Sequence, residues 1–370
     1  METMAQNIYP ASFQSLEKMV QGIEAGALEQ TRDHVQALLS NLPSAPIEQP
    51  ELVQRLFFLE GLRKRLDPAT QEVGNLYLTP DDEGRQIKAF NLMAEKFPLV
   101  RFSQEIINSA CIERFKDEKE LTILDIGIGM GQQIVRLLGQ AFNRQSLWRK
   151  IKVIGIEPAE ASLKQAKTAL TEWAQQHQVE LSFEGLQQSA ENLDEAEWTR
   201  LAQQLEPEQG HLLINCSFAL HHIRPVSLRN TLFERLKQFS PAMLTLIEPY
   251  ADFLTQDFSA RFAHAWHHYG LVFHAIDQID ADADDKSRIK RLFFSPEIQD
   301  VLSEDQHRVE QFETGEMWIS RLKKAGFEAV PIEPMPSQIP NCSFVGIVRH
   351  AEYLSMDVAG YPILSIIVAR

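Results

Sequence analysis

Residues 121–131 read LTILDIGIGMG, and this stretch decides the fold of the 370-residue chain. Its first six residues are mostly apolar and β-branched, which is typical of a buried strand. Glycines follow at positions 127, 129 and 131, and an apolar pattern of helical spacing begins directly after them. The stretch therefore predicts a strand, a glycine turn and a helix, which is the repeating unit of parallel α/β sheets.

The alternation of strand and helix continues after this stretch. A second strand is predicted over 151–157, and a long helix follows Pro158, because proline is favoured in the first helical turn. Further strands are predicted over 181–183, 212–216 and 243–247, with helices around 195–205 and 226–239. Five such strands in series indicate a parallel sheet with helices on both of its faces.

Helical patterns flank and interrupt the alternation. Apolar residues recur at helical spacing from Ser15 to about Lys116, and again within the aromatic-rich segment 251–313. We expect one large α/β unit with these divisions: a flexible terminus at 1–11, a helical cap at 12–115, and a core at 116–370 that carries 251–313 as a helical insertion. Near the end, a helix is predicted over 318–325, a strand over 327–332 and a hairpin around Gly360.

Composition and charge limit the function classes. Apolar residues make up 44% of the chain and charged residues 24%, which is typical of globular proteins that fold in water. The formal net charge of −15 disfavours nucleic acid as the main partner. The densest basic run, Arg63-Lys64-Arg65, has helical surroundings and indicates a solvated helix face.

The cysteines favour a reducing compartment. There are three of them, Cys111, Cys216 and Cys342, and an odd number of widely spaced cysteines does not fit a set of disulfide bonds. The first thirteen residues lack a signal-peptide pattern, and no stretch reaches eighteen uninterrupted apolar residues. We therefore expect a cytoplasmic protein without a membrane partner, although a specialised export signal would escape this test. The oligomeric state is not encoded in any pattern that we recognise.

The glycine turn indicates ligand binding. Glycines let backbone N–H groups approach an anionic group closely at the start of a helix. The spacing is one residue shorter than the dinucleotide motif Gly-x-Gly-x-x-Gly, so the turn alone is weak evidence. Glu157 lies 26 residues after Gly131 at the end of the next predicted strand, where a carboxylate can accept hydrogen bonds from ribose hydroxyls. Together they predict a nucleoside-type ligand; the alternative is a structural turn beside an incidental acid.

Residues 123–131 resemble the first motif of class I S-adenosylmethionine-dependent methyltransferases. Residues 188–193 and 215–223 are similar to later motifs of that family, with Ser189 standing where an aspartate is usual. The resemblance implies a Rossmann-like, mostly parallel seven-stranded sheet and S-adenosylmethionine as the cofactor. The implied cofactor-binding residues are Asp125, Gly127, Gly129, Gly131, Glu157, Ser189, Ala190, Glu191, Asn215 and Cys216.

A second resemblance covers nearly the whole chain and is to the GRAS-domain family, in its bacterial type. The matching blocks include residues 16–39, 57–66, 98–102, 121–125, 249–250, 261–274 and 318–327. Thr122 stands where plant members have histidine, and the usual terminal tryptophans are absent. Plant members generally lose the glycine turn that this chain keeps. The resemblance therefore implies a working methyltransferase that acts on a small molecule beneath a helical cap.

Candidates for proton handling follow the fourth and fifth predicted strands. They are His221, His222, Glu248 and Tyr250, which we expect at the carboxyl edge of the sheet. The alternative is that the histidines are loop and packing residues and that Glu248 caps a helix. Candidates for substrate contact, from the cap, are Phe90, Phe102, Asn108, Trp266 and Tyr269.

We expect no metal site. His264 and His268 have the spacing of two ligands on one helical face, but no third ligand is evident. The run 280–285 places Asp at the first, third and fifth positions of a calcium loop. It lacks the glycine at the sixth position and the glutamate at the twelfth.

The leading hypothesis is an S-adenosylmethionine-dependent methyltransferase that modifies O or N of a small molecule. The alternative is a catalytically silent, GRAS-like module that binds a small molecule or a protein partner. Methylation of nucleic acid is a third hypothesis, which the net charge opposes. The identity of the acceptor cannot be deduced from the sequence.

Overall fold

A mixed eight-stranded sheet forms the centre of the protein. The computed structural model describes residues 8–42, 49–67, 93, 96–205, 211–333 and 344–370. The strand order is β3-β2-β1-β4-β5-β8-β7-β6; the first five are parallel, and the last three pair antiparallel. The strands are β1 (Glu120–Ile126), β2 (Lys150–Ile156), β3 (Glu180–Leu186), β4 (Leu212–Ser217), β5 (Met243–Pro249), β6 (Val345–Arg349), β7 (Leu354–Val358) and β8 (Tyr361–Ala369).

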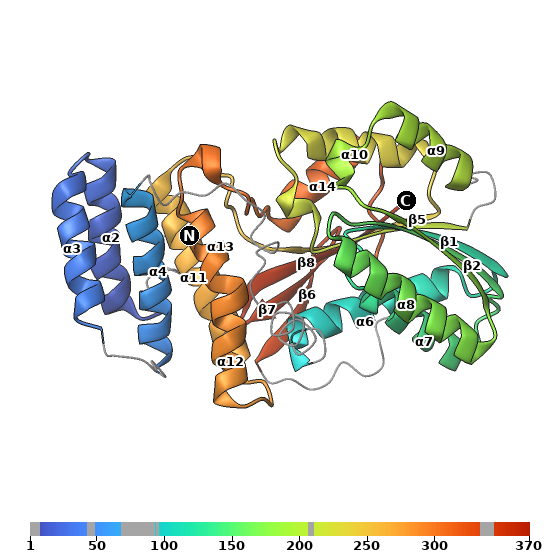
Figure 1. The fold of residues 1–370 in the computed structure, drawn as a ribbon, viewed down its shortest axis with the longest axis horizontal. Helices are drawn as coiled ribbons and strands as arrows, with labels where there is room; N and C mark the ends of the chain where they lie inside the picture. The colour runs from blue at the N-terminus through green and yellow to red at the C-terminus, as the bar shows by residue number, and fades with distance from the viewer. Residues whose placement is uncertain (1–7, 43–48, 68–92, 94–95, 206–210, 334–343) are drawn as a thin grey trace.

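Helices cover both faces of the sheet (Figure 1). On one face lie α6 (Pro98–Arg114), α7 (Gln132–Asn143) and α8 (Glu160–His177); on the other lie α9 (Glu195–Leu205), α10 (Ser227–Gln238) and α14 (Gly315–Lys324). Alternate strand residues supply the two cores. Ile123 packs in the core that includes α6 to α8, whereas its neighbour Leu124 packs in the core of α9, α10 and α14. This two-sided burial explains why the central strands β1, β4 and β5 are mostly apolar.

A separate group of helices packs beyond the β6 to β8 end of the sheet (Figure 1). Its members are α2 (Pro10–Glu24), α3 (Leu28–Ser40), α4 (Pro50–Leu66), α11 (Phe258–Asp277), α12 (Ala283–Ile289) and α13 (Ser295–Val301), which we call the helical lobe. Aromatic contacts hold it together: the Trp266 ring on α11 lies 4.9 Å from Phe58 on α4 and 6.2 Å from Phe13 on α2. Segments 200 residues apart in sequence thus share one core.

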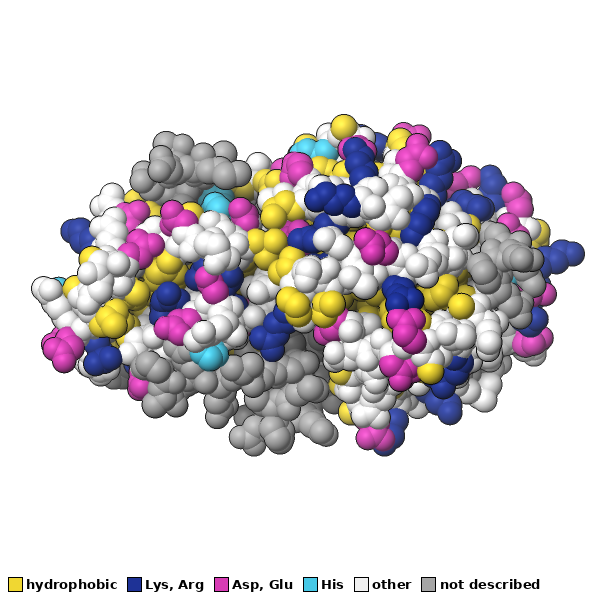
Figure 2. Space-filling view, turned by 90° about the horizontal axis from the view of Figure 1, so that it is seen from above, with side chains coloured by type: hydrophobic (Ala, Val, Ile, Leu, Met, Phe, Trp, Pro, Cys, Tyr) yellow, Lys and Arg dark blue, Asp and Glu magenta, His cyan; other side chains and the backbone are white. Residues whose placement is uncertain are grey.

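Short helical turns complete the chain. They are η2 (Ala190–Asn192), η4 (Leu220–His222), η5 (Lys290–Phe294, a π-helix) and η6 (Asp305–His307). No helix in the described residues is long and apolar enough to cross a membrane. On the face of the molecule seen in Figure 2, Lys and Arg side chains are interspersed with Asp and Glu.

Two predictions about the sheet are corrected. The described residues form eight strands where the methyltransferase resemblance implies seven. The edge strand β6 was not predicted from the sequence, because it is short and half-exposed and its apolar pattern is weak. The strand expected over 327–332 is reduced to an isolated bridge between Ala329 and Ala369. The hairpin around Gly360 is confirmed as β7 and β8, and Gly360 adopts a φ of +81° in the turn. The five parallel strands are confirmed in their order.

Candidate functional site

The glycine turn at 127–131 requires its glycines for different reasons. All three have positive φ values, which L side chains rarely adopt. A Cβ at Gly127 would lie 2.4 Å from the Cβ of Ala219, and one at Gly131 would lie 3.0 Å from that of Ala166. A Cβ at Gly129 would meet no atom within 4 Å. Gly127 and Gly131 therefore permit close packing, whereas Gly129 borders open space at the amino-terminal end of α7.

Glu157 links this turn to the end of β2. Its carboxylate accepts hydrogen bonds from the backbone N–H of Gly129, at 3.1 Å, and of Ala159, at 3.0 Å. Burial raises the pKa of Glu157. Each carboxylate oxygen has two acceptor sites, so both can still accept a further hydrogen bond. The predicted pairing of glycine turn and acid is thus present as a direct contact.

A buried polar network crosses β1, β4 and β5. Asp125, Asn215 and Thr245 stand side by side in the sheet register. The Asn215 amide donates to Asp125 at 3.2 Å, and its oxygen accepts from the Thr245 hydroxyl at 2.9 Å and from Gln133 at 3.3 Å. Burial raises the pKa of Asp125 to about 7. The network links β1, which leads into the glycine turn, to β4 and β5.

The raised pKa of Asp125 predicts a pH effect on stability. The folded state retains the proton between the unfolded pKa, about 3.9, and the folded pKa, so the free energy of unfolding falls as pH rises through this range. The substitution Asp125→Asn removes this titration. We therefore expect the free energy of unfolding of the variant, measured relative to the unsubstituted chain, to be about 2–3 kcal/mol higher at pH 8 than at pH 5. Urea unfolding at both pH values measures this difference. An equal effect of the substitution at the two pH values would contradict it.

The other implied cofactor residues have mixed environments. Ser189 precedes η2 and is partly buried, and Ala190 is buried. Burial raises the pKa of Glu191, while the positive charge of His222 acts to lower it. Cys216 is fully buried, and burial raises the pKa of its thiol well above the ordinary value. Cys216 is therefore an inert part of the core.

Glu248 organises the loop after β4 from the interior. It is fully buried; one carboxylate oxygen accepts from the backbone N–H groups of Ala219, at 3.0 Å, and Leu220, at 2.8 Å. The other oxygen lies 2.5 Å from Nδ1 of His221. Since a carboxylate only accepts, Nδ1 carries the proton and Nε2 of the neutral ring is an acceptor. Glu248 thus orients His221 and caps the short turn η4.

Glu310 completes this cluster and was not predicted from the sequence. It follows α13, about 90 residues after the histidines, and it is fully buried. Its two oxygens lie 3.5 Å from Nε2 of His221 and 3.4 Å from Nδ1 of His222. Glu310 stands in the stretch 308–314, RVEQFET, which contains no motif that indicates this approach. Long-range pairing of this kind has no local pattern.

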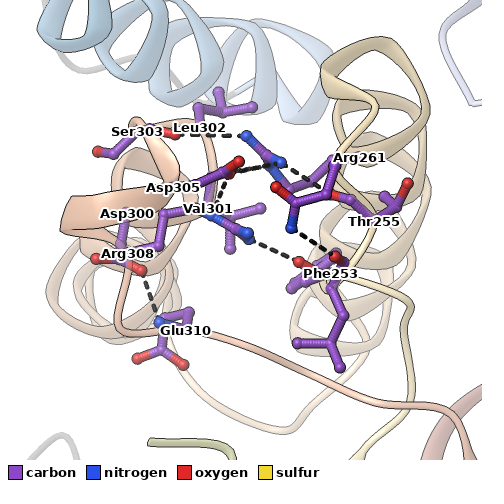
Figure 3. Close-up of polar contacts among 12 residues, drawn as sticks. Phe253, Thr255, Arg261, Asp300, Val301, Leu302, Ser303, Asp305, Arg308 and Glu310 are labelled. Carbon is purple, nitrogen blue, oxygen red and sulfur yellow. Dashed lines mark hydrogen bonds and ion pairs between the residues drawn. The ribbon is translucent and has the colours of Figure 1, made fainter. Parts of the chain in front are cut away.

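Glu310 is held in place by its backbone (Figure 3). The Asp300 carboxylate accepts from the N–H of Glu310 at 2.7 Å and from that of Val309 at 2.8 Å. The neighbouring Arg308 donates to the carbonyl of Phe253 at 2.6 Å, which ties the segment to the start of the insertion. Figure 3 also shows Arg261 on α11, which donates to the carbonyl of Val301 on α13 at 3.0 Å.

The remaining candidates are dispersed. The Tyr250 hydroxyl donates to Glu316 on α14 at 3.2 Å, and burial raises the pKa of Tyr250 to about 12. Trp266 is fully buried in the core of the helical lobe, where its indole N–H donates to the carbonyl of Ile8. Tyr269 is also fully buried, and the negative charges of Glu297 and Glu310 add to burial in raising the pKa of its hydroxyl. Tyr269 is therefore the lobe candidate that borders the histidine cluster.

Helix α6 carries two further candidates. Phe102 and Asn108 are both buried, and α6 packs on α7, β5 and β8. The Asn108 amide makes no side-chain hydrogen bond within the part of the chain that the structure describes. Phe90 lies outside the described residues.

The sequence is similar to a known protein family and to its plant members. The GRAS domain family model matches residues 14–339. The Scarecrow-like transcription factor PAT1 of Arabidopsis thaliana is 27% identical over 77% of this chain and 60% of that protein. The chain spans about 60% of the length of such curated relatives.

Comparison with solved structures shows the fold in one case. The crystal structure of SCL7 from Oryza sativa matches with a TM-score of 0.77 and 21% identity, covering 97% of this chain and 99% of that one. The CurJ carbon methyltransferase matches with a TM-score of only 0.47 and 15% identity, over 92% of this chain and 70% of that one. The first likeness shows the fold, and the second is too low to carry an argument.

Proposed function

The chain belongs to the GRAS domain family, and we propose that it is a small-molecule-binding member that holds S-adenosylmethionine at the glycine turn. The observation that supports this most is the open space at Gly129 beside the Glu157 carboxylate. Gly127 and Gly131 lie against packed neighbours, whereas Gly129 does not. Gly129 combines a positive φ with an unfilled position, which suits a close approach of backbone to ligand.

The residues present fit the parts of this cofactor. Glu157 would accept hydrogen bonds from the ribose hydroxyls, and the turn at the start of α7 would face its carboxylate. The segment 189–191 would border the adenine, with Ser189 a weaker acceptor than the usual aspartate. When bound, the cofactor would supply an electrophilic methyl group.

Glu157 gives the first binding test. We expect Glu157→Ala to weaken S-adenosylhomocysteine binding at least tenfold, because about 1.4 kcal/mol or more of charge-assisted hydrogen bonding is lost. Isothermal titration calorimetry of both proteins measures the change. Glu160→Ala, which removes an exposed carboxylate three residues away on α8, is the matched control and should bind like the parent. Equal affinities for the Glu157 and Glu160 variants would reject the assignment.

A regulatory binding role agrees best with the relatives. The name of PAT1 describes a transcription factor, and its match covers 77% of this chain. The cap candidate Trp266 is committed to packing within the helical lobe. We therefore propose that cofactor binding stabilises one arrangement of lobe and sheet, which a small molecule or protein partner then recognises.

Methyl transfer to a small molecule is the second candidate, and the histidine cluster favours it. Burial lowers the pKa of His221, so the ring is neutral near pH 7 and can accept a proton from an acceptor hydroxyl or amine. The interior Glu248 would stabilise the imidazolium that forms. Release of S-adenosylhomocysteine with a panel of hydroxyl- and amine-bearing small molecules distinguishes the candidates. Turnover lost in His221→Asn supports the enzyme, and tight binding without any turnover supports the regulatory module.

A further inference from the structure

We propose that His221, His222 and Glu310 bind a divalent transition-metal ion, with Zn²⁺ as the first choice. Each residue offers one ligand atom, and these atoms all lie within 4.8 Å of one another. The three residues come from the loop after β4 and from the segment after α13. They are far apart in the sequence, so a search for closely spaced metal ligands does not find them. The proposal concerns a site other than the glycine turn and does not depend on cofactor binding. It replaces the role of His221 as a base, because Nε2 of His221 would hold the ion.

The spacing of the ligand atoms fits a four-coordinate ion. The two nitrogen–oxygen distances to Glu310 are 3.5 Å and 3.4 Å, too long for good hydrogen bonds. Around a tetrahedral Zn²⁺ with bonds of about 2.1 Å, neighbouring ligand atoms are about 3.4 Å apart. Two imidazoles and a carboxylate leave a fourth position for water or substrate, which is the ligand pattern of catalytic zinc sites.

The environment of Glu310 also favours a bound cation. Its side chain is fully buried, and its oxygens face the two imidazoles at 3.5 Å and 3.4 Å, longer than ordinary hydrogen bonds. A buried carboxylate needs a compensating positive charge. The nearby Arg229 is directed to Glu313, at 2.5 Å. Without an ion, that charge comes from a protonated His222, whose pKa the Glu310 carboxylate raises against the effect of burial; a cation between Glu310 and the two imidazoles would take its place.

The surroundings also resemble those of a metal site. The pairing of Glu248 with Nδ1 of His221 orients Nε2 toward Glu310, and metal-binding histidines almost always have such a carboxylate or carbonyl partner. Asp300 fixes the backbone of Glu310 in the same way (Figure 3). The His222 side chain is 31% exposed, which gives an ion a route from solvent. A bound ion would lower the pKa of a coordinated water or acceptor hydroxyl.

Metal counting tests the site directly. The full chain is stripped with a chelator, equilibrated with one equivalent of ZnCl₂, desalted, and analysed by inductively coupled plasma mass spectrometry. We expect about one zinc per chain, and at least about a tenfold loss of retained zinc in Glu310→Gln and in His222→Asn. His34→Asn, which removes an exposed histidine on α3, should retain the ion.

A measurement on the unsubstituted chain guards against misfolded variants. Co²⁺ in a tetrahedral site of imidazole and carboxylate ligands gives intense visible absorption, and we expect this spectrum at one equivalent. Absence of both zinc uptake and the cobalt spectrum would overturn the proposal and leave a protonated His222 paired with Glu310. Zinc retained equally by the Glu310→Gln chain would overturn it as well. S-adenosylhomocysteine binding by the stripped chain is measured separately, so either proposal can fail alone.

Discussion

Gly129→Val is expected to abolish the binding of S-adenosylmethionine and S-adenosylhomocysteine while the protein remains folded. The valine side chain would enter the open space beside the turn, where no atom of the protein lies within 4 Å of the new Cβ. The same space is where the ligand would approach Glu157. We expect at least a hundredfold weaker binding by calorimetry, equivalent to about 3 kcal/mol or more.

The control for backbone strain is Gly360→Val. Gly129 has a φ of +52° and Gly360 a φ of +81°, and neither has a neighbour within 4 Å of a new Cβ. Each substitution therefore costs about 1–2 kcal/mol of local strain without a clash. Gly360 lies in the hairpin of β7 and β8, so its variant should bind the ligand normally. If Gly129→Val bound as tightly as Gly360→Val, the cofactor site would be elsewhere.

Arg229→Met is expected to destabilise the fold by about 3–5 kcal/mol. Arg229 on α10 is fully buried and pairs with Glu313 at 2.5 Å. It also donates to the backbone carbonyls of His221, at 2.5 Å, and Gln311, at 2.9 Å. Methionine would keep the apolar stem but leave these acceptors buried, with Glu313 retaining only Arg321. The guanidinium therefore holds together the two loops that carry the histidine cluster.

Denaturant unfolding measures this effect, with Arg235→Met as the control. Arg235 lies on the same helix and pairs with Glu195, whose side chain is 75% exposed. Exposed pairs contribute about 0–1 kcal/mol, so this variant should unfold near the parental midpoint. A loss below about 1 kcal/mol for Arg229→Met would show that the buried pair is not a main support of the loops.

The core of the fold could be predicted from the sequence because its signals are local. Strands buried on both faces are apolar runs, and the turn at 127–131 follows one of them directly. The edge strand β6 was missed, since a half-exposed strand at the sheet edge has a weaker pattern. The apolar run at 327–332 pairs with the end of β8 only around Ala329, where Glu328 and Arg370 exchange backbone hydrogen bonds, so it does not extend into a strand.

The candidate site was predictable only where its residues follow a strand. Glu157 and the glycine turn are joined by a hydrogen bond, in agreement with the expected placement at neighbouring strand ends. Glu310 arrives from a loop far along the chain, and no spacing indicates its approach to His221. For Trp266 the pattern was recognised but the role was not. An aromatic residue at helical spacing can line a pocket or fill a core, and Trp266 fills a core.

The most direct test of the central claim is calorimetric titration of the unsubstituted full chain with S-adenosylhomocysteine. The account predicts one site per chain with micromolar affinity, about −8 kcal/mol. It also predicts a higher melting temperature at saturating ligand, since binding to the folded state stabilises it. No heat of binding and no shift in melting temperature at millimolar ligand would contradict the account.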